Sequence, residues 1–181
     1  MKTVALAAVA AAVLSACASG PMMAPAMYSQ DALPDAVKVP AGHKVAMETV
    51  GAGEITYECR EKANAMGQFE WVFVGPAATL SDRSGKAVGK YYGPPATWEA
   101  NDTSKLTGAQ VAVAPAAAGS IPLQLVKANP AMGAGAMSGV TYIQRVATQG
   151  GVAPAVACTA QGKGMKQTVT YRADYIFWKA A

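Results

Sequence analysis

The chain has 181 residues, a length typical of one domain, and only 14% of them are charged. Its formal net charge is +4, and the lysines and arginines are scattered rather than grouped in runs. Because nucleic-acid sites are marked by clustered basic residues with aromatic residues among them, this composition argues against a nucleic-acid partner.

The first 16 residues have the pattern of a secretory leader. Lys2 precedes an apolar run from Thr3 to Leu14, which is too short to cross a bilayer as a stable helix. The run ends in Leu14-Ser15-Ala16-Cys17, which resembles the lipobox of bacterial lipoproteins, where the cysteine thiol receives a diacylglycerol group. We therefore expect residues 1–16 to be a lipoprotein signal peptide and Cys17 to carry the lipid. The alternative is an ordinary secretory leader with an incidental cysteine.

Ala18, rather than an aspartate, follows this cysteine. By resemblance to the enterobacterial sorting rule, Ala18 favours the outer membrane, so we expect a cell-envelope protein that faces the periplasm and contacts the membrane through its lipid anchor. Residues 17–40 are rich in Ala, Pro, Met and Ser and show no periodicity. This composition predicts a flexible tether after the lipidated cysteine, followed by a single domain over residues 41–181.

Short extended runs separated by turns fill the first half of this domain. Glu54–Arg60 alternates apolar and polar residues, which predicts a half-buried strand. Phe69–Val74 is apolar on both faces and is predicted to be buried on both sides. The polar cluster Leu80–Lys86 lies between two extended runs and predicts a hairpin. At most one short helix is expected, around Glu61–Met66.

The second half of the domain continues the same pattern. A polar turn separates Trp98–Ala100 from Leu106–Val113, and Pro122 predicts an edge or a strand start for the run that follows it. Ala131–Gly139 consists of small residues and methionine and is predicted to be a flexible loop. The last run is the clearest strand, with one apolar face made of Val169, Tyr171, Ala173, Tyr175 and Phe177. Together these runs predict an all-β fold, an antiparallel β-sandwich or barrel of short strands.

The chain contains three cysteines, an odd number for an exported protein. Lipidation of Cys17 would leave Cys59 and Cys158 as a pair. Because the periplasm is oxidising, we expect a Cys59–Cys158 disulfide, which would close a loop of about 100 residues. Two buried free thiols are the alternative.

Residues that could carry chemistry are few. His43 is the only histidine, so the ligands of a zinc site are not available, and we expect neither a metal nor another cofactor. No nucleophile elbow and no phosphate-binding loop occur in the sequence. The sequence therefore leans against catalysis but leaves it open, since a glycosidase pair would require only a second carboxylate near Glu99.

Aromatic and polar side chains in the least core-like segments form the candidate binding site. An exposed face of this composition binds a sugar or a peptide. In the alternative interpretation the aromatic residues fill the core and Glu99 pairs with Arg145. The candidate residues are Tyr91, Tyr92, Trp98, Glu99, Tyr142, Gln144 and Arg145.

Three blocks of the sequence resemble the DUF3455 family, whose function is unknown. They are Gly93-Pro94 with Thr97-Trp98-Glu99, Val140–Val146 with Gly150–Pro154, and Tyr171–Phe177. The resemblance covers residues 39–179, and it implies cysteines at positions 59 and 158. Two departures are the Pro94-Pro95-Ala96 insertion before the Thr97 block and Gln124 in a run that is usually more apolar. Because the family has no established activity, the resemblance implies no catalytic residues.

Three hypotheses for function follow from the sequence. The leading one is a lipid-anchored envelope protein whose β domain binds a ligand or partner outside the cytoplasm. The second is a structural or assembly accessory of the envelope without a small-molecule site. The third is a hydrolase that acts on envelope glycans.

Overall fold

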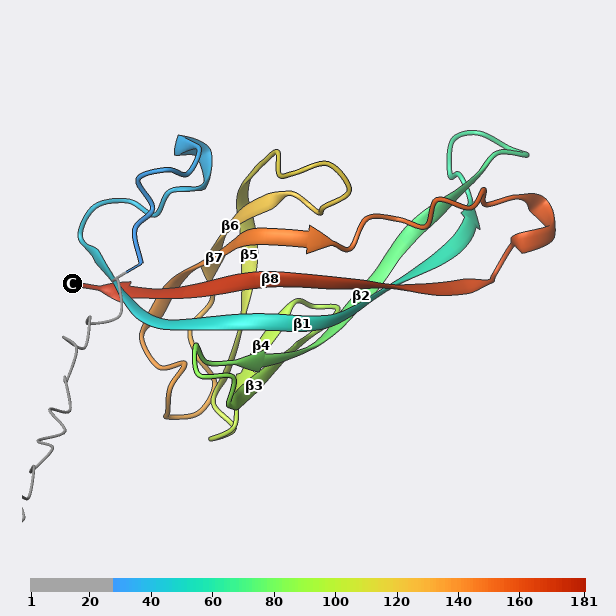
Figure 1. The fold of residues 1–181 in the computed structure, drawn as a ribbon. Coiled ribbons are helices and arrows are strands. Elements are labelled where there is room, and N and C mark those ends of the chain that lie inside the picture. The colour runs from blue at the N-terminus through green and yellow to red at the C-terminus, as the bar shows by residue number, and fades with distance from the viewer. Residues whose placement is uncertain (1–27) are drawn as a thin grey trace, which may run out of the picture.

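Eight antiparallel strands close into a barrel in the computed structural model, which describes residues 28–181 (Figure 1). The prediction of an all-β fold is confirmed, and of its two forms the structure has the barrel. Only two short 3-10 helices, η1 (Asp35–Val37) and η2 (Ala160–Gly162), interrupt the strands in this range. The strands are β1 (His43–Glu61), β2 (Phe69–Ser81), β3 (Ala87–Tyr92), β4 (Thr97–Ala100), β5 (Lys105–Ala114), β6 (Leu123–Ala128), β7 (Val140–Gly150) and β8 (Lys166–Ala180).

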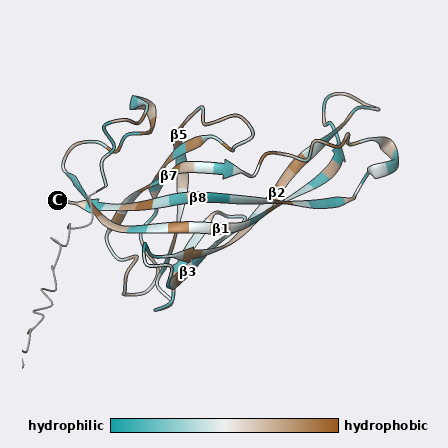
Figure 2. Cartoon of the chain, in the orientation of Figure 1, coloured by the Kyte–Doolittle hydropathy of each residue, from teal (hydrophilic) through white to brown (hydrophobic). Residues whose placement is uncertain are grey.

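The strands follow one another around the barrel in chain order. The last strand closes it, because β8 pairs with β1 from His43 opposite Ala180 to Glu58 opposite Lys166. Between β2 and β3 the backbone N–H of Asp82 donates to the carbonyl of Lys86, which confirms the predicted hairpin. Hydrophobic and hydrophilic residues alternate along the strands because successive side chains point to opposite faces (Figure 2).

Three strands continue beyond the barrel as an arm (Figure 1). The arm consists of residues 57–61 of β1, 69–73 of β2 and 166–170 of β8, with the loop 151–165 beside them. The predicted disulfide is confirmed: Cys59 of β1 is bonded to Cys158 of the loop, with 5.4 Å between the Cα atoms. The indole N–H of Trp71 donates to the carbonyl of Val156 at 2.7 Å, which holds the same loop to β2.

Two local predictions fail in the arm. Phe69–Val74 is not buried on both faces, since the Phe73 side chain is 51% exposed. The reason is that this half of β2 lies beyond the barrel interior. Residues 62–68 form turns rather than the short helix expected around Glu61–Met66, and β1 itself runs to Glu61.

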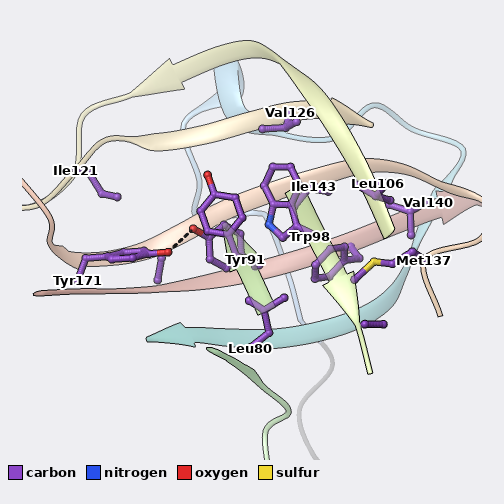
Figure 3. Close-up of a cluster of buried hydrophobic side chains, with 14 of the residues drawn as sticks. Leu80, Tyr91, Trp98, Leu106, Ile121, Val126, Met137, Val140, Ile143 and Tyr171 are labelled. Atoms are coloured by element: carbon purple, nitrogen blue, oxygen red, sulfur yellow. Dashed lines mark hydrogen bonds between the residues drawn. The ribbon is translucent and has the colours of Figure 1, made fainter. Parts of the chain in front are cut away.

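Large side chains fill the barrel interior (Figure 3). The inward face of β8 is the one that the sequence predicts, since all five of its residues belong to the core or pack against it. Gly51 lies under the Tyr175 ring, and a Cβ atom there would lie 2.5 Å from Cε2 of that ring. The glycine is therefore what lets Tyr175 lie flat across the interior.

One end of the barrel is closed by the loop 129–139. Its Met137 side chain enters the core and is 1% exposed. Asp102 holds the loop, because its carboxylate accepts hydrogen bonds from the hydroxyl and N–H of Ser104 and from the N–H of Ala136. These bonds, that of the Ser104 hydroxyl first, lower the pKa of Asp102. The loop predicted to be flexible is thus a fixed plug.

The segment 28–42 packs on the outside of the barrel. Val37 and Val39 are buried against outward-facing residues of β5 to β8. The sequence places these residues in a flexible tether that ends at Pro40. For residues 28–40 this prediction is wrong, because the outer face of the barrel offers an apolar surface that the segment covers.

The leader and Cys17 lie outside the described residues. Within residues 28–181, no helix has the length and apolar character required to span a membrane.

Candidate functional site

The end of the barrel opposite Met137 contains a cavity of about 250 Å³. The turn Gly93–Ala96 borders this cavity, whereas the turn that holds Met137 lies at the other end of β4. Both peptide bonds that precede a proline in the Gly93–Ala96 turn are cis. The cavity is lined by Phe73, Pro76, Tyr91, Gly93, Pro94, Ala96, Trp98, Gly108, Gln110, Gln124, Val126 and Arg145.

The floor of the cavity is an aromatic pair. Tyr91 and Trp98 are cross-strand neighbours on β3 and β4, and their rings stack with centroids 4.8 Å apart. Tyr175 packs against both rings from the far side of the barrel, at 5.0 and 6.0 Å. Figure 3 shows Tyr91 and Trp98 side by side within the buried cluster.

The Trp98 indole N–H has no hydrogen-bond partner, although the side chain is only 1% exposed. It is the one buried side-chain polar atom without a partner in the described part of the chain. The indole N–H groups of Trp71 and Trp178, in contrast, both donate hydrogen bonds. A buried donor without an acceptor costs about 1–3 kcal/mol, so Trp98 destabilises the core by that amount in return for its stacking.

Arg145 contributes a positive charge to the cavity wall. It lies on the same face of β7 as the fully buried Ile143, and it is paired across strands with Gln124 and Tyr175. Its Nε and Nη2 atoms donate to the carbonyl of Pro122 at 3.2 and 2.9 Å. These two bonds fix the guanidinium and leave the other N–H groups available.

Two glutamines complete the polar part of the wall. Gln124 donates to the side-chain oxygen of Gln110 at 2.6 Å, across β5 and β6. The bond leaves both N–H groups of Gln110, and the oxygen and second N–H of Gln124, for other partners. The cavity therefore combines flat apolar surfaces with a small set of convergent polar groups, the usual composition of a small-molecule site.

Glu99 lies outside this cavity, on the outer face of the barrel. Its carboxylate accepts a 2.7 Å hydrogen bond from the Tyr92 hydroxyl and pairs with Lys90 at 3.1 Å. These two interactions, that of Tyr92 first, lower the pKa of Glu99. A carboxylate held in its charged form is poorly suited to act as a general acid.

The expected exposed face is wrong for Tyr91 and Trp98, which are 6% and 1% exposed and belong to the core, as the alternative interpretation has it. The Glu99–Arg145 pair of that alternative is wrong, because the two side chains point to opposite sides of the barrel wall.

Tyr142 and Gln144 face a third environment, under the segment 28–42. The Tyr142 ring meets the His43 ring edge to face at 5.0 Å. Gln144 is completely buried, and its amide bonds to Tyr28, Gln30, Val37 and Trp178. The seven candidate residues are thus divided among three surfaces, and the structure brings only Tyr91, Trp98 and Arg145 together in the cavity.

The cavity is completed by residues that are not among the seven candidates, including Phe73, Gln110 and Gln124. Gln124 carried a signal, since it is polar in a run that is otherwise apolar. Gln110 and Phe73 had no such mark, because a strand pattern does not show which strands become neighbours around a barrel. Among residues 28–181, no group of three or more His, Cys, Asp or Glu is placed to hold a metal ion.

A family model described as "Protein of unknown function (DUF3455)" matches residues 40–179. The match covers the barrel and the arm, including both cysteines of the disulfide. No curated protein and no solved structure matches the chain.

Proposed function

The chain belongs to the DUF3455 family, for which no function is described, and from the structure we propose that it is a small-molecule-binding protein of the cell envelope. The observation that carries this proposal is the cavity lining, which combines the stacked Tyr91 and Trp98 rings with an Arg145 guanidinium whose only hydrogen bonds within residues 28–181 go to the Pro122 carbonyl. Flat apolar surfaces with a few convergent polar groups are the usual composition of a small-molecule site. The barrel provides a rigid wall. The site is the open end of the barrel beside the turn Gly93–Ala96, which we call the mouth.

The cavity is open at one end only. The loop of Met137 closes the opposite end of the barrel, and the stacked Tyr91 and Trp98 rings lie between that loop and the mouth. The exposed residues Phe73, Pro94 and Gln110 form the rim. A ligand can therefore enter from the mouth without any strand of the barrel moving apart.

Occupation of the cavity is expected to shift the Trp98 indole signal in a ¹H–¹⁵N NMR spectrum. The chain contains three tryptophans, and of these only Trp98 lines the cavity, so a ring bound there would change the environment of its indole group. We would add benzyl alcohol, benzamide and benzoate separately at millimolar concentration to the domain from residue 28 onward. A Trp98→Phe variant assigns the signal. If none of the three compounds moves the Trp98 signal, the binding proposal is overturned.

The envelope location rests on the sequence and on the disulfide, which fits an oxidising compartment. We propose that Cys17 carries the lipid and that the protein is held at the outer membrane, facing the periplasm. The segment that follows the tether packs at Tyr28 against Trp178, near the C-terminal end of β8, with ring centroids 6.0 Å apart. The arm lies at the far end of β8 from Trp178 (Figure 1), so we propose that the anchored end and the arm are at opposite ends of the barrel.

The lipid anchor has a direct test. Full-length protein expressed in a Gram-negative host is expected to incorporate radiolabelled palmitate and to sediment with membranes, because acyl chains attached at Cys17 insert into the bilayer. A Cys17→Ser variant should lose both properties, whereas Cys59→Ser should keep the label. Retention of label and membrane sedimentation by Cys17→Ser would rule out lipidation at this residue.

A second candidate function is supported by the arm. Several large apolar side chains are exposed on the arm and its loop, which is unusual for a surface without a partner. This favours an accessory that acts through protein contacts, and the candidate takes precedence if no compound enters the cavity. The exposed residues are Phe73 of the arm, Val152, Val156 and Met165 of its loop, and Met66 of the turn 62–68 that joins β1 to β2.

A further inference from the structure

The charge in the cavity wall is not neutralised by the protein. Arg145 bonds only to the carbonyl of Pro122, and within residues 28–181 no carboxylate lies within ion-pairing distance of it. Of the five N–H donors of a guanidinium, the carbonyl takes two. An inward-facing arginine in this state is a binding group for an anion, because the partly desolvated charge gains more from an opposite charge than it would in water.

The other titratable groups around the guanidinium are neutral phenols. Burial raises the pKa of Tyr57, Tyr91, Tyr171 and Tyr175, and the positive charge of Arg145 opposes this rise only in part. None of the four can therefore supply a negative charge near neutral pH. The acidic residue closest in sequence to the floor, Glu99, is on the outer face and is already paired with Lys90.

The apolar walls of the cavity determine which ligand shape fits. The stacked Tyr91 and Trp98 rings form one flat surface, and Phe73, Pro76 and Pro94 supply other apolar surfaces. The volume of about 250 Å³ equals that of roughly eight water molecules in the liquid, which is the size of a single substituted ring. The polar groups of this space are the Arg145 guanidinium and the Gln110–Gln124 pair, both on its wall.

We propose that the cavity is selective for a small planar anion, namely an aromatic carboxylate with one ring. The carboxylate binds the free N–H groups of Arg145, with the Gln110 amide as a further donor. The ring lies against the stacked Tyr91 and Trp98 pair. This proposal rests on the proposed ligand-binding function, and it adds the charge and the shape of the ligand.

A comparison of benzoate with benzamide isolates the effect of the ligand's charge on binding. The two compounds have the same ring and a planar substituent of similar size, but only benzoate is an anion. Calorimetric titration of the domain from residue 28 onward is expected to give a dissociation constant about tenfold or more lower for benzoate than for benzamide. Both compounds should shift the Trp98 indole signal. Because this comparison uses the unmodified domain, it does not depend on how any variant folds.

Arg145→Gln tests whether this residue is the group that holds the charge. The variant is expected to raise the dissociation constant for benzoate about tenfold or more and to leave that for benzamide unchanged. Arg172→Gln is the matched control, since Arg172 is exposed on the outward face of β8, and it should bind both compounds as the wild type does.

Each result bears on a different part of the argument. Equal affinity for the two compounds, or full benzoate affinity in Arg145→Gln, would overturn the choice of an anion while the cavity remains a binding site. If neither compound binds or shifts the Trp98 signal, the proposed function fails together with this extension of it.

Discussion

Replacing both Cys59 and Cys158 by serine is expected to lower the free energy of unfolding by about 4 kcal/mol. The two cysteines are 99 positions apart, so the disulfide removes a large share of the conformational freedom of the unfolded chain. For a domain of this size the loss corresponds to a fall of roughly 10 °C in melting temperature. Urea unfolding and thermal unfolding of the domain from residue 28 onward would measure the two quantities.

The disulfide lies in the arm, and this position predicts which properties survive its loss. Cys59 and Cys158 line a separate hollow with Trp71 and Met165, away from the residues of the mouth. The Trp98 indole signal should therefore be unchanged in the double variant at low temperature. Wild-type protein unfolded in the presence of a reductant is the control, because it should reach the same melting temperature as the variant. An unchanged melting temperature would mean that the disulfide does not constrain the unfolded state.

Gln144→Leu is expected to lower the free energy of unfolding by roughly 2–6 kcal/mol. The Gln144 amide uses both its donors and its acceptor: it donates to Gln30 and to the carbonyl of Val37, and it accepts from Trp178 and Tyr28. Leucine fills a similar volume but satisfies none of these groups, so the Val37 carbonyl and the Trp178 N–H would be left buried without partners. Each such group costs about 1–3 kcal/mol.

The loss of the Gln144 hydrogen bonds should loosen the segment 28–42, which this residue holds against the barrel. When the segment 28–42 detaches from the barrel, trypsin gains access to Lys38, so cleavage there should be faster in Gln144→Leu than in wild type. Gln149→Ala is the matched control, since Gln149 lies on the same strand, is exposed, and makes none of these contacts. Equal cleavage rates at Lys38 in Gln144→Leu and wild type would show that the amide is not what holds the segment.

The same residue illustrates how position along a strand decides role. Gln144 and Arg145 are consecutive on β7, and the strand period of two places them on opposite sides of the barrel wall. Gln144 therefore anchors the outer segment, whereas Arg145 lines the cavity. Tyr91 and Tyr92 are divided in the same way, which explains why a cluster of neighbours in the sequence becomes three separate environments.

Much of the fold follows from local patterns in the sequence. The alternation in Glu54–Arg60 and in the last strand predicts both the strands and their buried faces, because a half-buried strand requires that period. The polar turn clusters predict the hairpins for a similar reason, since their side chains can bond to their own backbone, as Asp82 does with the N–H groups of Ser84 and Lys86. The disulfide pairing follows from the count of cysteines and the inferred compartment.

Only the tertiary structure decides where these elements meet. Closure of β8 on β1 depends on pairings far apart in the chain, and it is this closure that turns Tyr91, Trp98 and Arg145 toward one another and Glu99 away from them. The order of residues 28–40 also depends on a distant surface, because Val37 and Val39 are buried only once β5 to β8 lie side by side. The sequence by itself determines the strands, their faces and the crosslink, which are local or combinatorial properties. The cavity and its unpaired charge arise from long-range contacts, which no local pattern contains.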